Sequence, residues 1–211
     1  MNLPDSSGLE QIAALTLAHY DERAESFRDG TRDHDVSQNV DALLRHITAP
    51  SPYTILDFGC GPGRDLKTFS GLGHRAIGLD GSERFVRMAC EESGCEVWHQ
   101  EFFSLSLPGG HFDGVFANAS LFHVPRAELP RVLAQLYVAL KPGGVLFCSN
   151  PHGLDVEGWN AGRYGTYHSL ETWRSFMRQA GFAELEHFYR PAGLPREHQP
   201  WLASVWRRSY E

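Results

Sequence analysis

Apolar residues follow two different periods along this chain, and the change between them predicts the architecture. From Leu9 to Phe27 they recur every three or four positions, which indicates a helix that Gly30 ends. A second helix is expected from Asp35 or Ser37 to Ile47. Short apolar runs then alternate with helical patterns from residue 53 to 180, an order typical of a parallel sheet with helices on both faces.

The alternating region divides into strands and helices joined by short connections. Strands are predicted at 53–58, 75–79, 95–98, 112–117 and 143–149. Helices are predicted at 64–72, 82–93, 126–140 and 169–180, with Ser169 as the cap of the last one. The fold class is therefore α/β, with a doubly wound, mainly parallel sheet.

The end of the chain departs from this alternation. Phe182–Arg190 and Trp201–Arg208 are both rich in β-formers, and the proline-rich segment Pro191–Pro200 separates them. Two strands joined in this way predict a hairpin that closes the sheet. We expect one domain overall, with a core of residues 51–211 under an N-terminal helical cover of residues 1–50.

Composition narrows the possible partners and the compartment. A net charge of −7 over 211 residues argues against a nucleic-acid surface, which needs clustered Lys and Arg. The chain has no run of eighteen apolar residues, and Met1–Gly8 lacks the regions of a signal peptide, so no membrane association and a cytoplasmic location are expected. The four cysteines have no Cys-x-x-Cys spacing and indicate reduced thiols, and the eleven histidines show no metal-binding spacing.

A glycine-rich turn carries the first chemical signal. Gly59, Gly61 and Gly63 follow an apolar strand and precede a helix, so a ligand can approach bare backbone there. Asp80 ends the next predicted strand, where an acid grips a nucleoside ribose. Together they indicate a nucleotide-like cofactor, although a turn that only reverses the chain is the alternative. The glycine spacing, with Arg64 in the sixth position, disfavours a nicotinamide oxidoreductase.

With Asp57 before it, the turn has the pattern Asp-x-Gly-x-Gly-x-Gly, which resembles motif I of the class I S-adenosylmethionine-dependent methyltransferases of the small-molecule type (methyltransferase domain 11/25-like). The resemblance continues in order: 78–82 with the ribose-binding strand end, 100–102 with the adenine contact, 112–118 with the fourth strand, and 140–146 with the turn into the fifth. It implies a Rossmann-like, seven-stranded sheet with a reversed last strand beside the sixth, and an N-terminal helical lid. The implied cofactor is S-adenosyl-L-methionine, with S-adenosyl-L-homocysteine as its product.

The resemblance also implies a set of cofactor-binding residues. Asp57 suits the amino group of the methionine moiety, directly or through water. Arg64 and Asp65 nearly cancel in charge at the helix start, which disfavours a phosphate ligand. The full set is Tyr20, Asp57, Gly59, Cys60, Gly61, Gly63, Asp80, Gly81, Ser82, Gln100, Glu101, Phe102, Asn118, Ala119 and Ser120.

The acceptor is expected beyond the carboxyl ends of the strands. His123, after the fourth strand, is a candidate base because imidazole titrates near neutral pH, but it equally suits a brace for its loop. The connection 150–168 is too long for a minimal turn, and long loops in compact domains are usually functional. The candidate acceptor contacts are Phe27, Arg32, His34, Trp159, Arg163, Tyr164, Tyr167 and His168.

The predicted function is transfer of a methyl group from S-adenosylmethionine to an N, O or S atom of a small molecule. An arginine among aromatic side chains suits a planar or carboxylate-bearing acceptor. The alternative is a catalytically silent methyltransferase-like module that senses the cofactor or assists a partner protein. The sequence sets neither the acceptor nor the oligomeric state.

Overall fold

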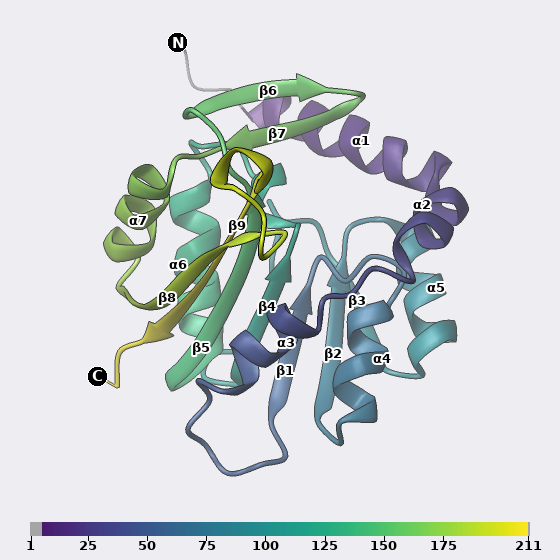
Figure 1. The fold of residues 1–211 in the computed structure, drawn as a ribbon. Coiled ribbons are helices and arrows are strands. Elements are labelled where there is room, and N and C mark those ends of the chain that lie inside the picture. Colours follow the sequence, from purple (N-terminus) through teal and green to yellow (C-terminus); the bar gives the residue numbers. More distant parts are fainter. Residues whose placement is uncertain (1–5, 211) are drawn as a thin grey trace.

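A seven-stranded sheet forms the centre of the computed structural model, which describes residues 6–210 (Figure 1). The strand order is β3-β2-β1-β4-β5-β9-β8, and β9 runs antiparallel to both of its neighbours. The strands are β1 (Thr54–Phe58), β2 (Arg75–Asp80), β3 (Glu96–His99), β4 (Phe112–Asn118), β5 (Leu140–Pro151), β8 (Phe182–Arg190) and β9 (Trp201–Arg208). The predicted mainly parallel sheet with a reversed last strand is confirmed.

Helices cover both faces of the sheet, because successive strand residues point to opposite sides. Along β4, Phe116 packs into the layer under α3 (Ser37–Leu44), α4 (Arg64–Gly71) and α5 (Glu83–Ser93). Its neighbour Val115 packs into the opposite layer, under α6 (Leu129–Ala139) and α7 (Leu170–Gln179). Both side chains are fully buried, so the sheet is the middle of a three-layer domain.

Two further helices, α1 (Ser6–Glu22) and α2 (Ala24–Thr31), extend across the edge where the parallel strands end (Figure 1). The 3₁₀ turn η1 (Leu121–His123) follows β4 at this edge, and η2 (Arg196–His198) lies between β8 and β9. At the other end of the strands, Asp113 ties three segments together. One of its oxygens accepts from the Thr54 backbone N–H at 2.8 Å, and the other pairs with Lys141 Nζ at 2.8 Å.

The N-terminal helices differ from the sequence prediction. One helix was predicted over 9–27, but Arg23 leaves the helical conformation (φ −115°, ψ 16°) and divides it into α1 and α2. Gly30 lies inside α2 and does not end it. The helix predicted at 126–140 begins only at Leu129, with a proline in its first turn. The separation into a lid (1–50) and a core (51–211) stays a prediction.

The segment 150–168 is not the irregular loop that its length suggested. It holds a two-stranded hairpin of β6 (Val156–Asn160) and β7 (Arg163–Tyr167). Ala161 and Gly162 make the turn with φ of 49° and 82°, the positive values that two-residue hairpin turns require. This hairpin lies over the same sheet edge as α1, and β7 contacts α1 and η1 (Figure 1).

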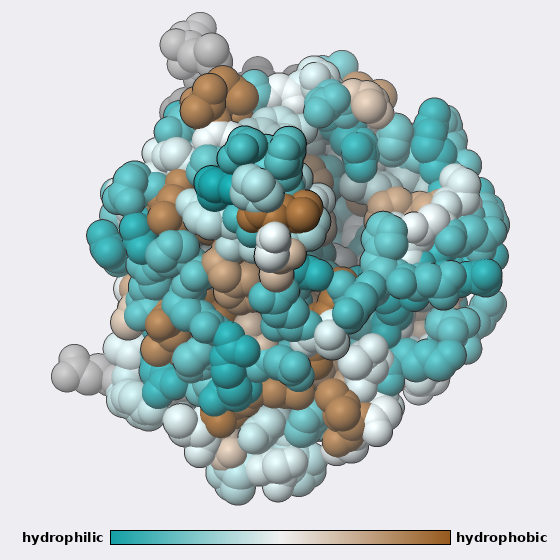
Figure 2. All heavy atoms as spheres, viewed as in Figure 1, coloured by the Kyte–Doolittle hydropathy of each residue, from teal (hydrophilic) through white to brown (hydrophobic). Residues whose placement is uncertain are grey.

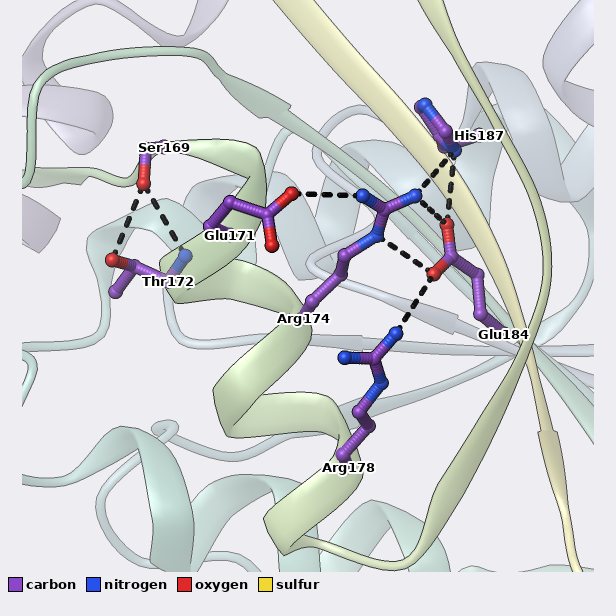
Figure 3. Close-up of polar contacts among 7 residues, drawn as sticks. All are labelled: Ser169, Glu171, Thr172, Arg174, Arg178, Glu184 and His187. Atoms are coloured by element: carbon purple, nitrogen blue, oxygen red, sulfur yellow. Dashed lines mark hydrogen bonds and ion pairs between the residues drawn. The ribbon is translucent and has the colours of Figure 1, made fainter.

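The last helix is fixed to the outer strand by an ion-pair cluster (Figure 3). Ser169 caps α7 as predicted, since its hydroxyl accepts from the Thr172 backbone N–H at 3.2 Å. Arg174 donates to both carboxylate oxygens of Glu184 on β8, at 2.8 and 2.9 Å, and to Glu171 at 2.9 Å. The cluster therefore joins an element of the sheet to the helix that covers it.

The structure also bears on the cysteines, on membrane-spanning helices and on clusters of metal ligands. The four cysteines are free thiols. No helix within residues 6–210 combines the length and the apolar character needed to cross a bilayer. Over the same residues, no group of three or more His, Cys, Asp or Glu side chains is placed to hold a metal ion.

Candidate functional site

A cavity of about 610 Å³ opens at the carboxyl edge of the sheet, beneath α1 and α2. Figure 2 shows the surface hollowed between α2 and the β8–β9 connection, with a mostly hydrophilic rim. Its volume lies in the range of about 300–1,000 Å³ that is usual for small-molecule sites. The ends of β1, β2, β4 and β5 contribute to its walls, as does the strand pair β8–β9.

The glycine turn after β1 exposes backbone to this cavity. Gly59, Gly61 and Gly63 have φ of 76°, 54° and 94°, values that only glycine adopts readily. A Cβ on Gly59 would lie 2.4 Å from Ser120 Cβ, whereas a Cβ on Gly61 would meet nothing closer than 3.8 Å. Gly63 is different, because its Cβ would lie 2.7 Å from the Ala89 Cα. Two glycines therefore border the cavity, and the third lets α4 pack on α5.

Asp80 ends β2 with its carboxylate held by backbone donors. One oxygen accepts from the Gly61 N–H at 2.9 Å and the other from the Ser82 N–H at 2.9 Å. An ionised carboxylate has about four lone-pair positions, so each oxygen retains accepting capacity toward the cavity. Burial raises the pKa of Asp80 to about 6, and the backbone hydrogen bonds oppose that rise. The group is therefore an acceptor for paired hydroxyls once it is ionised.

Asp57 lies beneath the glycine turn and outside the cavity lining. Only 1% of it is exposed, and its Oδ2 has no hydrogen-bond partner within the described residues. Burial, and next the nearby Asp65, raise the pKa of Asp57 well above its ordinary value. A buried carboxyl oxygen without a partner is costly, so this position favours a bound donor such as an amino group or water.

A chain of polar side chains connects the end of α2 to the end of β4. Arg64 donates to both oxygens of Asp65 at 2.7 and 2.9 Å, and to the Thr31 carbonyl at 2.9 Å. Asn118 donates to Asp65 at 3.2 Å and accepts from Asn39 Nδ2 at 3.1 Å. Arg64 and Asp65 thus neutralise each other, and Asn118 is held in one orientation in the cavity wall.

Tyr20 of α1 and His123 of η1 meet in the cavity wall. Since the Tyr164 carbonyl can only accept, His123 donates to it through Nδ1 at 2.6 Å. Nε2 of His123 is then an acceptor, and the Tyr20 hydroxyl donates to it at 2.8 Å. Burial lowers the pKa of His123 to about 4, so the ring is neutral near pH 7. Arg163 also donates to the Tyr20 oxygen, at 3.3 Å.

Most of the residues predicted from sequence are brought together here. The cavity is lined by the candidate base, eleven of the cofactor candidates and three of the acceptor candidates. These are His123; Tyr20, Gly59, Cys60, Gly61, Asp80, Gly81, Glu101, Phe102, Asn118, Ala119 and Ser120; and Phe27, His34 and Arg163.

Besides Asp57 and Gly63, two cofactor candidates lie outside the lining. The Ser82 hydroxyl caps α5 by accepting from the Phe85 N–H at 3.1 Å, and it donates to Asp21 at 2.5 Å. The Gln100 side chain turns to Ser106, accepting from its N–H at 2.8 Å and donating to its carbonyl at 3.3 Å. Both side chains therefore make hydrogen bonds to nearby backbone groups and are not directed into the cavity.

Five acceptor candidates also lie outside the lining. Arg32 is exposed and pairs with Asp33, and His168 is buried under α7 beside Trp173. Trp159, Tyr164 and Tyr167 pack on the β6–β7 hairpin: the first two rings meet at 5.6 Å, and the Tyr167 hydroxyl accepts from Asn160 at 3.2 Å. Burial raises the pKa of Tyr164 to about 12. Alternation along the hairpin places Trp159 and Tyr164 on the face opposite Arg163. Tyr167 shares the face of Arg163, but its hydroxyl folds back onto Asn160 and Gly165.

Sequence reasoning missed several lining residues: Ile12, Ala13, Thr16, Leu17, Val36, Asn39, Phe85, Phe103, Phe122, Ser149, Arg190, Pro191 and Trp201. A usable signal existed for Arg190 and Trp201. They end β8 and begin β9, so an antiparallel last strand places both at the carboxyl edge, where they pair with each other. No local signal marks the α1 residues, since their apolar pattern indicates only a buried helix face.

Comparison with known proteins agrees with this geometry. A family model described as a methyltransferase domain matches residues 55–144. The chain is 27% identical over 187 residues to a trans-aconitate 2-methyltransferase of Yersinia pseudotuberculosis, covering 80% of this chain and 65% of that protein. It is 26% identical over 148 residues to an 18S rRNA (guanine-N(7))-methyltransferase of Schizosaccharomyces pombe, covering 64% of this chain and 55% of that protein. The chain thus spans less than two thirds of the length of either relative.

A solved structure shares the whole fold. It is the Burkholderia thailandensis 1,6-didemethyltoxoflavin-N1-methyltransferase with bound 1,6-didemethyltoxoflavin and S-adenosylhomocysteine. The TM-score is 0.79 over 99% of this chain and 93% of that one, at 21% sequence identity. At that identity the likeness establishes the fold alone.

Proposed function

Because this chain belongs to the class I S-adenosylmethionine-dependent methyltransferases, we propose that it transfers a methyl group from S-adenosylmethionine to an N, O or S atom of a small molecule. The sequence prediction of this family and its cofactor is confirmed. The observation that carries the proposal is one cavity lined at one end by the glycine turn and Asp80, and at the other by Trp201 and Arg190. Such a cavity gives a cofactor and an acceptor a common space.

The residues around the turn fit this cofactor. The Asp80 carboxylate would accept the ribose hydroxyls, and the open backbone of Gly59 and Gly61 would border the methionine moiety. The unpartnered oxygen of Asp57 would receive the amino group directly or through water. Phe102, stacked on Phe58 at 4.3 Å between ring centres, would flank the adenine.

The cofactor supplies a methyl group already activated on a sulfonium. The protein therefore needs mainly to orient the acceptor and to exclude water, which can contribute several kcal/mol. Asn118, held by Asp65 and Asn39, is a polar group of fixed orientation in the cavity wall. Tyr20 would hold α1 across the site through its bond to His123.

His123 suits a positioning role better than that of a base. Its Nε2 already accepts the Tyr20 proton, and an imidazole with a pKa of about 4 removes a proton poorly near pH 7. The reaction that these groups support best is therefore one whose nucleophile enters the site already unprotonated.

The net charge of the chain favours a small acceptor over RNA. The chain carries a net charge of −7, and a nucleic-acid site needs clustered cations that contact phosphates. One relative is named for trans-aconitate and another for 18S rRNA, so the relatives' names alone do not decide between the two classes.

The cofactor site is tested by calorimetric titration of the protein with S-adenosylhomocysteine. Because ribose binding requires ionised Asp80, whose pKa is about 6, protons compete with the ligand and the affinity falls below pH 6. Asp80→Asn is expected to weaken binding by about 10- to 100-fold, the value of one or two hydrogen bonds to a charged group, and to remove this pH dependence. No binding by the natural chain at any pH would contradict the proposal.

Transfer is tested separately with S-adenosylmethionine labelled in its methyl group. A small-molecule metabolite extract and total RNA are offered in parallel, with Asp80→Asn protein as the control. Label is expected in the metabolite fraction. Label in RNA alone would overturn the choice of acceptor class, and cofactor binding without transfer to either pool would favour the silent module.

A further inference from the structure

Arg190 is a cation in the cavity that lacks an acidic partner. One of its terminal nitrogens donates to the Asp35 carbonyl at 2.9 Å, and its Nε is buried with no hydrogen-bond partner. Its guanidinium makes no ion pair with a carboxylate of residues 6–210. The acid beside it is Asp35, whose carboxylate accepts from the Ser37 N–H at 2.9 Å and makes no hydrogen bond to the guanidinium. The Ser37 hydrogen bonds, and to a smaller extent the charge of Arg190, lower the pKa of Asp35. A half-buried guanidinium with unused donors favours an anion from outside the chain.

The surroundings of Arg190 are apolar and aromatic. Phe122 and Trp201 line the same cavity, with ring centres 6.3 Å apart and planes at 84°. Pro191 and Val36 also contribute to the lining. Planar walls beside a guanidinium suit a flat ligand whose carboxylate can take two parallel N–H donors.

The position of Arg190 in the sheet separates it from the cofactor residues. The glycine turn follows β1, and β8 lies four strands away in the order β1-β4-β5-β9-β8. At about 4.8 Å per strand this is about 19 Å between strand axes. Arg163 gives no such separation, because it contacts Tyr20 close to the end of β4. Arg190 is therefore the cation placed on the acceptor side.

We propose that the acceptor is a small planar carboxylic acid whose carboxylate binds Arg190 while its flat body lies against Trp201 and Phe122. The proposal rests on the methyltransferase function proposed above and adds the chemical class of the acceptor. The carboxylate of the cofactor's own methionine moiety has the same chemistry, and it is the other possible partner of this arginine.

The test uses matched pairs of probes: benzoate with benzamide, and trans-cinnamate with cinnamamide. Binding to the full chain is measured by calorimetry with and without saturating S-adenosylhomocysteine. The acids are expected to bind at least tenfold more tightly than the amides, and Arg190→Met is expected to remove this preference. Arg190→Lys keeps the positive charge but loses the paired N–H donors of the guanidinium, so it should retain part of the preference for acids over amides.

Arg196→Met is the matched control, because Arg196 lies on the same β8–β9 connection, stacks on Tyr189 at 3.5 Å and is absent from the cavity lining. It should leave every affinity unchanged, and thermal unfolding of each variant checks its fold. Acids that bind no better than amides, or an unchanged preference in Arg190→Met, overturn the proposal.

If Arg190→Met also loses affinity for S-adenosylhomocysteine, the arginine binds the cofactor, and the proposal that it binds the acceptor is overturned. If the natural chain does not bind S-adenosylhomocysteine, the methyltransferase proposal fails. The comparison of acids with amides still decides the role of Arg190 in that case.

Discussion

The two ends of the cavity are built from different materials. The end at β1 and β2 is made of backbone: glycines with positive φ, and a carboxylate held by N–H groups. The end at β5, β8 and β9 is made of side chains from separate segments, such as Phe122, Arg190 and Trp201. At Gly59 the backbone end has no room for an added Cβ, whereas a side-chain site changes its ligand by exchange of one residue. The difference suits a constant cofactor beside a variable acceptor.

The largest effect is expected from a methyl group added to the backbone end. In Gly59→Ala the new Cβ would lie 2.4 Å from Ser120 Cβ, at a φ of 76° that costs about 1–2 kcal/mol for any other residue. We expect S-adenosylhomocysteine affinity to fall at least tenfold, together with a lower free energy of unfolding in urea. A variant with normal affinity would show that the backbone end is not the cofactor site.

Gly30→Ala is the matched control for that substitution. Gly30 lies within α2, its φ is not positive, and a Cβ there would meet nothing within 4 Å. Alanine should raise the free energy of unfolding by about 0.5 kcal/mol or less, because Gly30 lies in the last turn of α2 and not in its interior, and it should leave cofactor affinity unchanged.

An intermediate effect is expected where α1 meets the loop after β4. Tyr20→Phe leaves the buried Nε2 of His123 without its donor, at a cost of about 1–3 kcal/mol. His123→Asn should cost a similar amount, and the double variant should cost less than the sum, by about 0.5–3 kcal/mol in a urea-unfolding cycle. Additive losses would show that the two side chains are not coupled.

The same pair gives a pH test with a definite sign. Burial lowers the pKa of His123 from 6.5 to about 4, so the unfolded chain binds the extra proton more readily. This contribution to stability is complete above pH 6.5 and is lost as the pH falls toward 4. His123→Asn should remove that part of the pH dependence.

The contrast between the two ends also explains what the sequence could predict. Gly59, Gly61 and Asp80 act through local backbone, so contiguous residues revealed them. Tyr20 and His123 are 103 residues apart, and the pairing of Arg190 with Trp201 depends on the register of the last two strands. No local sequence pattern predicts either pairing. Ser82 and Gln100 lay in the right segments, but backbone groups beside them took up their hydrogen bonds.

The sequence of the β6–β7 hairpin carries a signal for a tight turn. Residues 156–160 and 163–167 each contain aromatic or β-branched residues and are separated by two residues, Ala161-Gly162, which is the spacing of a tight hairpin. Reading 150–168 as a loop assigned Trp159, Tyr164 and Tyr167 to the acceptor on proximity alone. Hairpin alternation places Trp159 and Tyr164 opposite Arg163, whereas Tyr167 shares the face of Arg163 and lies outside the lining because its hydroxyl bonds to Asn160.

The smallest effect is expected from the ion-pair cluster on α7, which lies outside the cavity (Figure 3). Arg174→Met should lower the free energy of unfolding by about 1 kcal/mol or less, because the pair with Glu184 is partly solvated. The hydrogen bonds from Arg174 lower the pKa of Glu184, so their contribution is present above pH 4.5 and lost as the pH falls below it.

Arg178 supplies the internal control, since it lies 3.9 Å from Glu184 and its side chain is 64% exposed. Arg178→Met should have a smaller effect than Arg174→Met, and both losses should shrink at high salt. Neither substitution should alter affinity for S-adenosylhomocysteine or for a planar acid, because the cluster fixes a covering helix to the outer strand and touches neither end of the cavity. A change in acid affinity in Arg174→Met would show instead that the contacts between α7 and β8 affect the position of Arg190 at the end of β8.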